Sequence, residues 1–214
     1  MATDPSASPT SSLIDRVKNI LVTPKTEWPR IDAEPATVGS IFRNYVLILA
    51  AIPPLASAIG QLLFGIRFFG IVYRPGPAGV IATAVCQYVL TLVGVYVLAL
   101  IIDALAPTFG GTKDQVKAVK VAAYSGTAGW VAGIFAIIPM LGWLGIFGAI
   151  YGLYLLWLGL PLLMRVAQDK AVGYIIATIV AAIVVYIVVG MIAMSLAGAF
   201  VSVPGPAGGS LSLG

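Results

Sequence analysis

Long uncharged runs alternate with short polar stretches along most of the chain. The longest run, residues 121–164, holds 44 residues without a Lys, Arg, Asp, Glu or His. A single helix of that length would measure roughly 66 Å, about twice the hydrocarbon core of a bilayer. We therefore predict two membrane crossings that fold back at residues 138–143, where Pro139 removes a backbone donor and Trp143 suits the membrane boundary.

The same reading applied to the other runs predicts an all-α membrane protein with five transmembrane helices in residues 37–200. The helices are expected at about 38–65, 78–102, 120–138, 143–164 and 172–200. Thr37 is expected to cap the first of them. The Pro53-Pro54 pair must kink or break that helix. The freed carbonyls could serve a substrate, as in transporters, or be accommodated by neighbouring helices, which is the commoner outcome.

Polar segments flank this domain on both sides. Residues 1–11 are expected to be disordered, and residues 201–214 to form a flexible tail. Residues 12–36 are predicted to form a cytoplasmic or interfacial helical segment that begins with a short amphipathic helix capped by Ser12. Its apolar arc consists of Leu13, Ile14, Val17, Ile20 and Leu21. This arc could lie on the membrane surface or pack on the cytoplasmic ends of the bundle.

Two short polar connections carry further predictions. Thr23 and Pro24 are expected to start a second short helix, and Trp28 to act as a packing or interface anchor. In the 103–120 connection, Thr112 and Gln115 have capping-box spacing. We expect Asp103, at the end of the second membrane helix, to pair with a cation at the cytoplasmic surface. The candidates are Lys113, Lys117, Lys120 and Arg165.

Composition agrees with a polytopic membrane protein. The chain is 60% hydrophobic and 9% charged, with a mean hydropathy of +1.03, whereas a soluble domain is about 25% charged. The net charge of +4 comes from twelve basic residues that are spread along the chain, so we expect no nucleic-acid partner. The single cysteine, Cys86, excludes a disulfide within the chain.

The basic residues predict an orientation. If five helices cross and the N-terminus is cytoplasmic, ten of the twelve basic residues lie inside, and Arg67 and Arg74 lie outside. Cytoplasmic loops of membrane proteins carry an excess of Lys and Arg. The ten are Arg16, Lys18, Lys25, Arg30, Arg43, Lys113, Lys117, Lys120, Arg165 and Lys170. The charge distribution therefore favours an N-terminus in the cytoplasm.

Catalytic groups are scarce in this sequence. There is no histidine, no second carboxylate inside a crossing and no Gly-rich phosphate loop, which argues against nucleophilic, metal-dependent and phosphate chemistry. Gln87 is expected to form an interhelical hydrogen bond. We expect no enzyme, no cofactor and no metal site.

Three segments resemble the Yip family of integral membrane proteins, in its short prokaryotic form. They are residues 13–17 with Pro24 and Trp28; the stretch containing Asp103, Pro107, Phe109, Gly110 and Gly111; and Pro139 leading to Tyr151, Tyr154 and Pro161. The resemblance spans residues 13–195. It implies five transmembrane helices, a cytoplasmic N-terminus and, from the eukaryotic members, a role in membrane trafficking and organisation.

Two functions remain open at the level of sequence. The first is a non-enzymatic scaffold or interaction partner in the inner membrane, with the surface helix and the 103–120 loop as its working face. Its partners would be the bilayer, other membrane proteins or a second copy of the chain. The alternative is a small-solute, ion or lipid transporter or channel. Its polar path would be lined by Pro53, Pro54, Gln87, Tyr124, Ser125 and Tyr151.

Overall fold

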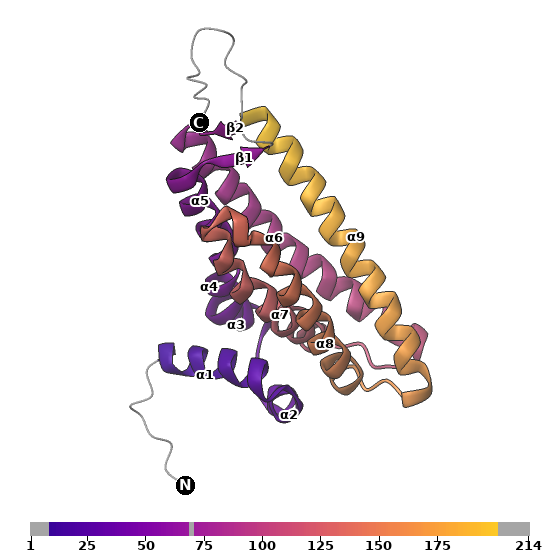
Figure 1. Ribbon diagram of the computed structural model, residues 1–214. Helices are drawn as coiled ribbons and strands as arrows, with labels where there is room; N and C mark the ends of the chain where they lie inside the picture. The colour runs from indigo at the N-terminus through magenta and orange to yellow at the C-terminus, as the bar shows by residue number, and fades with distance from the viewer. Residues whose placement is uncertain (1–8, 69–70, 201–214) are drawn as a thin grey trace.

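The computed structural model describes residues 9–68 and 71–200 and shows an elongated helical bundle (Figure 1). In chain order the elements are α1 (Pro9–Val22), α2 (Pro24–Ala33), α3 (Val38–Ile41), η1 (Phe42–Val46), α4 (Leu47–Leu49), α5 (Ile52–Phe64), β1 (Ile66–Phe68), β2 (Ile71–Tyr73), α6 (Pro77–Leu105), η2 (Ala106–Phe109), α7 (Gln115–Ala132), η3 (Gly133–Ile137), η4 (Pro139–Leu144), α8 (Gly145–Leu163) and α9 (Gln168–Phe200). Helices α1 and α2 lie at one end of the bundle, and the β1–β2 hairpin lies at the other.

The N-terminal helix starts earlier than its sequence pattern indicates. Helix α1 begins at Pro9, three residues before the predicted cap at Ser12, so residues 9–11 are helical. The rest of the segment expected to be disordered, residues 1–8, lies outside the described residues, as does the expected tail at 201–214. Helix α2 begins at Pro24 after Thr23, as predicted, although the Thr23 side chain makes no capping hydrogen bond.

The first membrane segment begins at the predicted residue. The Thr37 hydroxyl accepts a hydrogen bond from the Ser40 backbone N–H at 3.1 Å, and the Ser40 hydroxyl accepts one from the Thr37 N–H at 3.0 Å. This reciprocal pair satisfies two donors that the first helical turn leaves free. The segment then runs from Val38 to Phe64 and ends at Gly65, whose φ of 68° suits glycine.

Two irregularities divide that segment. The first is a π-helical turn, η1, and the second is the interruption at residues 50–51. Helix α5 restarts at Ile52 with Pro53 in its first turn. Because neither Pro53 nor Pro54 has a backbone N–H, the helical hydrogen bonds cannot continue across them. The predicted break is therefore present, and it lies just before the proline pair.

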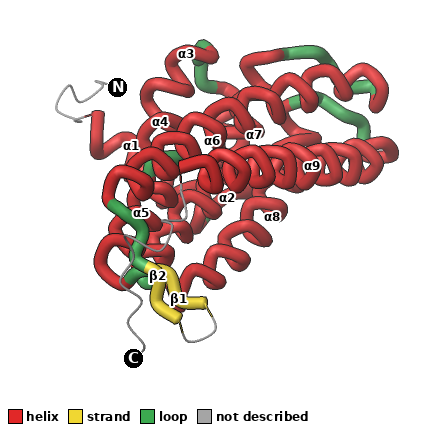
Figure 2. The backbone as a smooth tube through the Cα atoms, turned by 90° about the horizontal axis from the view of Figure 1, so that it is seen from above, coloured by secondary structure: helices red, strands yellow, loops and turns green. Residues whose placement is uncertain are grey.

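A short β-hairpin interrupts the otherwise all-helical fold that the sequence predicts. Strands β1 and β2 pair antiparallel, with Ile66 opposite Tyr73 and Phe68 opposite Ile71. Bulky β-branched and aromatic residues such as Ile66, Phe68 and Tyr73 suit a pleated strand. Figures 1 and 2 both place the hairpin beside the end of α5.

In the described part of the chain, four helical segments are long and apolar enough to cross a membrane. They are Val38–Phe64, Pro77–Phe109, Pro139–Leu163 and Gln168–Ala193. The third predicted crossing, at about 120–138, differs from them because α7 has 18 residues with Lys117 and Lys120 in its first half. It continues towards the turn as the 3₁₀ helix η3. By length and composition these four are candidate membrane spans, whereas the third predicted crossing is shorter and carries two lysines.

Helix α7 lies at the centre of the bundle. It contacts α1, α3, α5, α6 and α8, and most of its side chains from Ala118 to Trp130 are buried. Its small residues allow neighbouring backbones to approach closely, which explains why a helix of lower hydropathy can occupy the core. In contrast, α6 and α9 pack side by side on the outside and expose much of their apolar surface (Figure 2).

The predicted fold-back between the third and fourth segments is present. Ile138 is extended and Pro139 begins η4, so the chain reverses inside the predicted 138–143 window. Glycines allow close contact nearby. A Cβ on Gly148 would lie 2.6 Å from the Ala128 carbonyl oxygen, and one on Gly133 would lie 2.5 Å from the Pro53 ring. Gly129, four residues before Gly133 and so at the spacing that can bring two helices close, faces open space.

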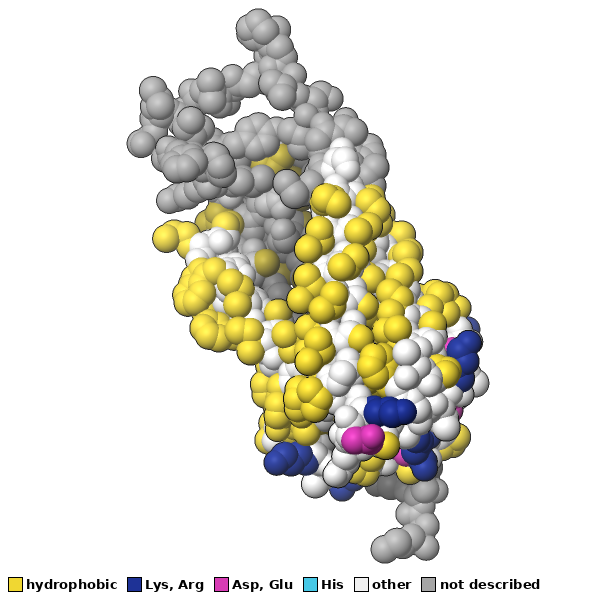
Figure 3. Space-filling model, turned by 90° about the vertical axis from the view of Figure 1, so that its right-hand side faces the viewer, with side chains coloured by type: hydrophobic (Ala, Val, Ile, Leu, Met, Phe, Trp, Pro, Cys, Tyr) yellow, Lys and Arg dark blue, Asp and Glu magenta, His cyan; other side chains and the backbone are white. Residues whose placement is uncertain are grey.

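Side-chain character divides the outer surface into two zones. Figure 3 shows a broad band of hydrophobic side chains, and Lys, Arg, Asp and Glu gather below it at one end. The exposed apolar residues belong largely to α5, α6, α8 and α9. A surface this apolar is expected to face lipid, so the zones separate a membrane-embedded part from a polar end.

Candidate functional site

The polar end is built on α1 and α2, which together we call the platform. Helix α1 packs its predicted apolar arc against the bundle: Ile20 is fully buried, and Leu13, Val17 and Leu21 are partly buried against the core. Ile14 is the exception and stays exposed. Of the two arrangements open to the arc, packing on the bundle is therefore the one observed.

Trp28 fixes the platform to α8. Its side chain is 1% exposed, and its ring lies edge-on to Tyr124 with the centroids 6.4 Å apart. The ring occupies the surface above Gly159, where a Cβ would come within 2.5 Å of the indole. Trp28 is thus the packing anchor that the sequence predicts, and the residue it packs against is Gly159 of α8.

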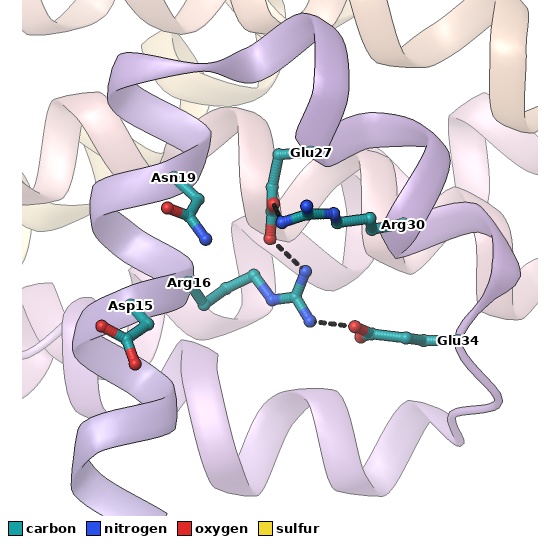
Figure 4. A pocket seen from close by; sticks show the side chains of 6 residues that line it. All are labelled: Asp15, Arg16, Asn19, Glu27, Arg30 and Glu34. Atoms are coloured by element: carbon teal, nitrogen blue, oxygen red, sulfur yellow. Dashed lines mark hydrogen bonds and ion pairs between the residues drawn. The ribbon is translucent and has the colours of Figure 1, made fainter. Parts of the chain in front are cut away.

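A buried ion pair links the two helices of the platform. Arg16 of α1 donates from one guanidinium nitrogen to Glu27 and from the other to Glu34 (Figure 4). The Glu27 side chain is 2% exposed, and Arg30 also approaches it at 3.5 Å. A buried carboxylate is costly without such partners. Arg16 therefore carries the main electrostatic contact between α1 and α2.

The Arg16 guanidinium is held in its charged form. Burial disfavours the charge, but the hydrogen bond to Glu34 and the carboxylates of Glu34 and Glu27 favour it, so the pKa of Arg16 is raised above its usual value. The guanidinium also lies 5.9 Å from the centre of the Tyr124 ring. This distance allows a cation–π interaction.

A second ion-pair group connects the platform to the bundle. Asp32 of α2 pairs with Lys117 of α7 at 2.8 Å and with Arg165, which follows α8, at 3.4 Å. Lys120 donates to the backbone carbonyls of Ile31 at 2.6 Å and Glu34 at 2.5 Å. These contacts bring the N-terminal segment, the start of α7 and the end of α8 to one place.

Replacing Lys120 by methionine should loosen the end of α2. The lysine side chain is 4% exposed, and the substitution leaves two carbonyls without a charged donor. Hydrogen bonds to charged groups contribute about 1.5–3 kcal/mol each, so we expect a loss of about 2–3 kcal/mol in the free energy of unfolding. Thermal unfolding in detergent measures it. Lys113→Met, which changes an exposed lysine at the same end, should leave the midpoint unchanged.

Two hollows open beside these ion pairs. One, of about 260 Å³, is lined by Asp15, Arg16, Asn19, Glu27, Arg30 and Glu34 (Figure 4). The other, of about 350 Å³, lies between the residues after α2 and the start of α7. In the described part of the chain, no group of three or more His, Cys, Asp or Glu side chains is placed to hold a metal ion. The arrangement suits binding of a polar surface group.

Asp103 does not make the predicted ion pair. It lies in the last turn of α6, and its Oδ1 is buried without a hydrogen-bond partner among the described residues. Lys117 and Arg165, two of the cations expected to pair with it, pair with Asp32. The prediction failed because the choice between two carboxylates depends on how α2 packs, which local sequence does not specify.

The residues after Asp103 form a tight corner against α9 and the end of α8. Pro107 and Phe109 lie in η2, and Phe109 stacks on Tyr174 with the ring centroids 5.3 Å apart. Gly110 has a φ of 73°, and a Cβ on Gly111 would lie 2.7 Å from the Met164 carbonyl oxygen. Both positions therefore require glycine.

The capping box predicted at Thr112 is not used, because Asp114 caps α7 instead.

The residues of the predicted polar path line neither of the two hollows described above. Tyr151 donates to the Leu21 carbonyl at 2.7 Å, and Ser125 donates to Val121 within its own helix at 2.6 Å. Neither of the two hollows is lined by Pro53, Pro54, Gln87, Tyr124, Ser125 or Tyr151. Half-buried Gln87 makes no side-chain hydrogen bond within the described residues. Its predicted interhelical bond is therefore absent there.

The other predicted site residues have structural positions. Pro53 packs on Gly133, Pro54 is buried, and Pro139 starts η4 after the fold-back. Tyr154 is largely exposed next to Tyr151, with the ring centroids 5.5 Å apart. The residues that sequence reasoning missed are Arg16, Glu27 and Asp32, which hold the platform. The feature of the sequence that could have indicated them is the presence of acidic and basic residues within an otherwise amphipathic segment.

Comparison with known proteins assigns the chain to a family. The sequence model of the Yip1 domain matches residues 18–202. The chain is also 26% identical over 160 residues to "Inner membrane protein YohC" of Escherichia coli strain K12, covering 73% of this chain and 82% of that protein. The same values apply to the protein of that name from E. coli O6:H1 strain CFT073. No solved structure matches the chain at a significant level. Because the domain match covers most of its length, the chain belongs to the Yip1 family of membrane proteins.

Proposed function

We propose that this protein is a non-enzymatic, multi-pass inner-membrane protein that uses its platform to bind another membrane protein, in a role of membrane organisation. The observation that carries the proposal is the way α1 and α2 are held. The Arg16 ion pairs join α1 to α2, and Trp28 and Asp32 fix the platform on α7 and α8. A polar surface that is fixed in this way is preorganised for a partner, because little ordering entropy remains to be lost on binding.

The proposed topology has five crossings with a cytoplasmic N-terminus. Helix α7 with η3 supplies the remaining crossing, buried among its neighbours. The Asp32 ion pairs join the N-terminal segment to the start of α7 and to the end of α8, so these three segments share one side. This side carries ten of the twelve basic residues. Positive charge of this kind is typical of the cytoplasmic side, and the inner membrane is named in the YohC proteins.

Reporter fusions test this topology. A reporter that is active only in the cytoplasm is expected to work at the N-terminus and to fail after residue 200. A reporter active only outside should give the opposite pattern. Signals from both ends in the same compartment would contradict five crossings. A fusion within the 138–143 turn distinguishes a buried third crossing from a re-entrant one, because only a true crossing exposes that turn outside.

A site-specific photo-crosslinker tests the platform. We place it at Arg30, an exposed residue of α2, in the full-length protein in native membranes. The matched control carries it at Met140, an exposed residue at the opposite end of the bundle. A reproducible protein adduct from Arg30 and not from Met140 is expected. The absence of any adduct from Arg30, or equal adducts from both positions, would count against the platform as the partner-binding surface.

The absence of catalysis rests on composition. The sequence has no histidine and a single cysteine, so the commonest bases and nucleophiles are missing or few. Glu27 and Asp32 of the platform are engaged in ion pairs with Arg16, Arg30, Lys117 and Arg165. Groups held in this way serve binding and stability more readily than proton transfer.

A further inference from the structure

The outer edge of the platform carries two apolar and two basic side chains that the bundle does not use. Ile14, Lys18 and Val22 follow at intervals of four residues and so share one face of the helix. Lys25 follows in the first turn of α2. Ile14 is 60% exposed and Val22 is 69% exposed, and both lysines are exposed. We call these four residues the outer edge.

Packing and ion pairing in the platform are carried by other residues. Leu13, Val17, Ile20 and Leu21 make the apolar contacts, and Asp15, Arg16 and Asn19 line the hollow (Figure 4). Within the described residues neither Lys18 nor Lys25 has an ion-pair partner. Arg16 and Arg30, in contrast, are both paired. The outer edge therefore combines unpaired positive charge with exposed apolar area.

The position of α1 indicates what kind of partner binds the outer edge. Figure 1 shows α1 projecting sideways from the bundle, across the direction of the long helices, at the end where Figure 3 shows the charged side chains. A helix in that position runs alongside the boundary of the apolar zone. Apolar side chains next to lysines, on a helix of this orientation, are typical of contact with the interface of an anionic bilayer.

We propose that the outer edge binds anionic lipid headgroups of the surrounding membrane, with Lys18 and Lys25 contacting phosphate and Ile14 and Val22 entering the acyl boundary. The proposal rests on the membrane architecture and not on the partner-binding role of the platform. Each lysine near an anionic surface contributes about a five-fold preference for contact, so the pair contributes about 25-fold. The contact should weaken at high salt, because exposed charges are screened.

Spin labelling in reconstituted bilayers tests the contact. The single native cysteine is replaced by Cys86→Ala, and Val22→Cys provides the labelling position. The protein is reconstituted into phosphatidylcholine alone and into phosphatidylcholine with phosphatidylglycerol. In the anionic bilayer we expect the label to gain collisions with oxygen, which concentrates in lipid, and to lose collisions with a water-soluble nickel chelate. A label that is equally water-accessible in both bilayers would overturn the proposal.

Charge variants identify the groups responsible. In the labelled protein, Lys18→Gln with Lys25→Gln should lower the ratio of lipid-contacting to water-exposed label by about 25-fold. The control pair, Lys113→Gln with Lys170→Gln, removes the same charge from exposed residues of the same end and should leave the ratio unchanged. An equal effect of both pairs would reject a specific contact. Shielding that appears only at high protein-to-lipid ratio would mean that a second copy covers the edge, and would also overturn the proposal.

Discussion

Replacing Gly159 by leucine is expected to detach the platform and to lower the free energy of unfolding by about 3–5 kcal/mol. The new Cβ alone would lie 2.5 Å from the Trp28 ring, so the larger side chain cannot share the space. Trp28, which is 1% exposed, must leave its site. Loss of a buried tryptophan costs about 3–5 kcal/mol, which corresponds to a fall in the unfolding midpoint on the order of 10 °C.

A control and a double substitution isolate this contact. Gly190→Leu makes the same change on α9, where no atom lies within 4 Å of the added Cβ, and should be neutral. Trp28→Ala should cost about as much as Gly159→Leu, but in the Trp28→Ala background the leucine should cost little. If Gly159→Leu costs as much without Trp28 as with it, the indole is not what the glycine accommodates.

Trypsin offers a second measure of the same variant. The platform contains Arg16, Lys18, Lys25 and Arg30, each a site for cleavage. In the parent protein α1 and α2 are folded onto the bundle, and helical backbone resists proteolysis until it opens locally. Gly159→Leu should speed cleavage in this segment and leave Lys170, at the start of α9, at its parent rate. A uniform increase at all sites would indicate general unfolding.

The membrane-spanning elements were predictable because each depends on local sequence. Length and the absence of charge located the helices, and Pro139 located the fold-back at 138–143. Thr37 was predictable because its capping partner, Ser40, is three residues away. What these features share is that the stabilising groups are neighbours in the chain. Their free energy therefore does not depend on which helices meet.

The features that failed depend on tertiary partners. Asp114 and Thr112 both suit a cap before α7; Thr112 instead donates its backbone N–H to the Met164 carbonyl at 2.9 Å, and Asp114 caps the helix. Asp32 pairs with residues from α7 and from the loop after α8, and no periodicity of the N-terminal segment predicts those positions. A glycine pattern shows where close approach is allowed, but Gly129 meets nothing and Gly159, outside any pattern, holds Trp28.

The dependence on tertiary partners also explains how much of the candidate site could be predicted from the sequence. The sequence pointed to the surface helix and to the 103–120 loop as the working face. In the structure it is α2, which follows that helix, that contacts the loop, through the ion pair of Asp32 with Lys117 and the hydrogen bond of Lys120 to Ile31. It did not indicate the central contact, because Glu27 reads as an ordinary polar residue of a short helix. Only burial, at 2% exposure, makes its charge decisive.

Arg16 forms two ion pairs that should differ greatly in strength. Arg16→Met leaves the buried Glu27 with the more distant Arg30 alone, and breaking a buried pair by removing one partner costs about 3–5 kcal/mol. Glu34→Gln breaks the other pair, but the Glu34 side chain is 49% exposed. A solvent-exposed pair contributes at most about 1 kcal/mol. Thermal unfolding of the two variants in detergent should therefore show a large shift for Arg16→Met and a small one for Glu34→Gln.

The double variant Arg16→Met with Glu27→Gln distinguishes lost attraction from buried charge. Most of the cost of Arg16→Met is the penalty of an under-compensated carboxylate in the interior, and the neutral amide removes that charge. We therefore expect the double variant to recover more than half of the lost stability, and trypsin sensitivity of the platform to recover with it. If the double variant is as unstable as Arg16→Met, the guanidinium acts through its packing on Tyr124 and the platform is held mainly by shape.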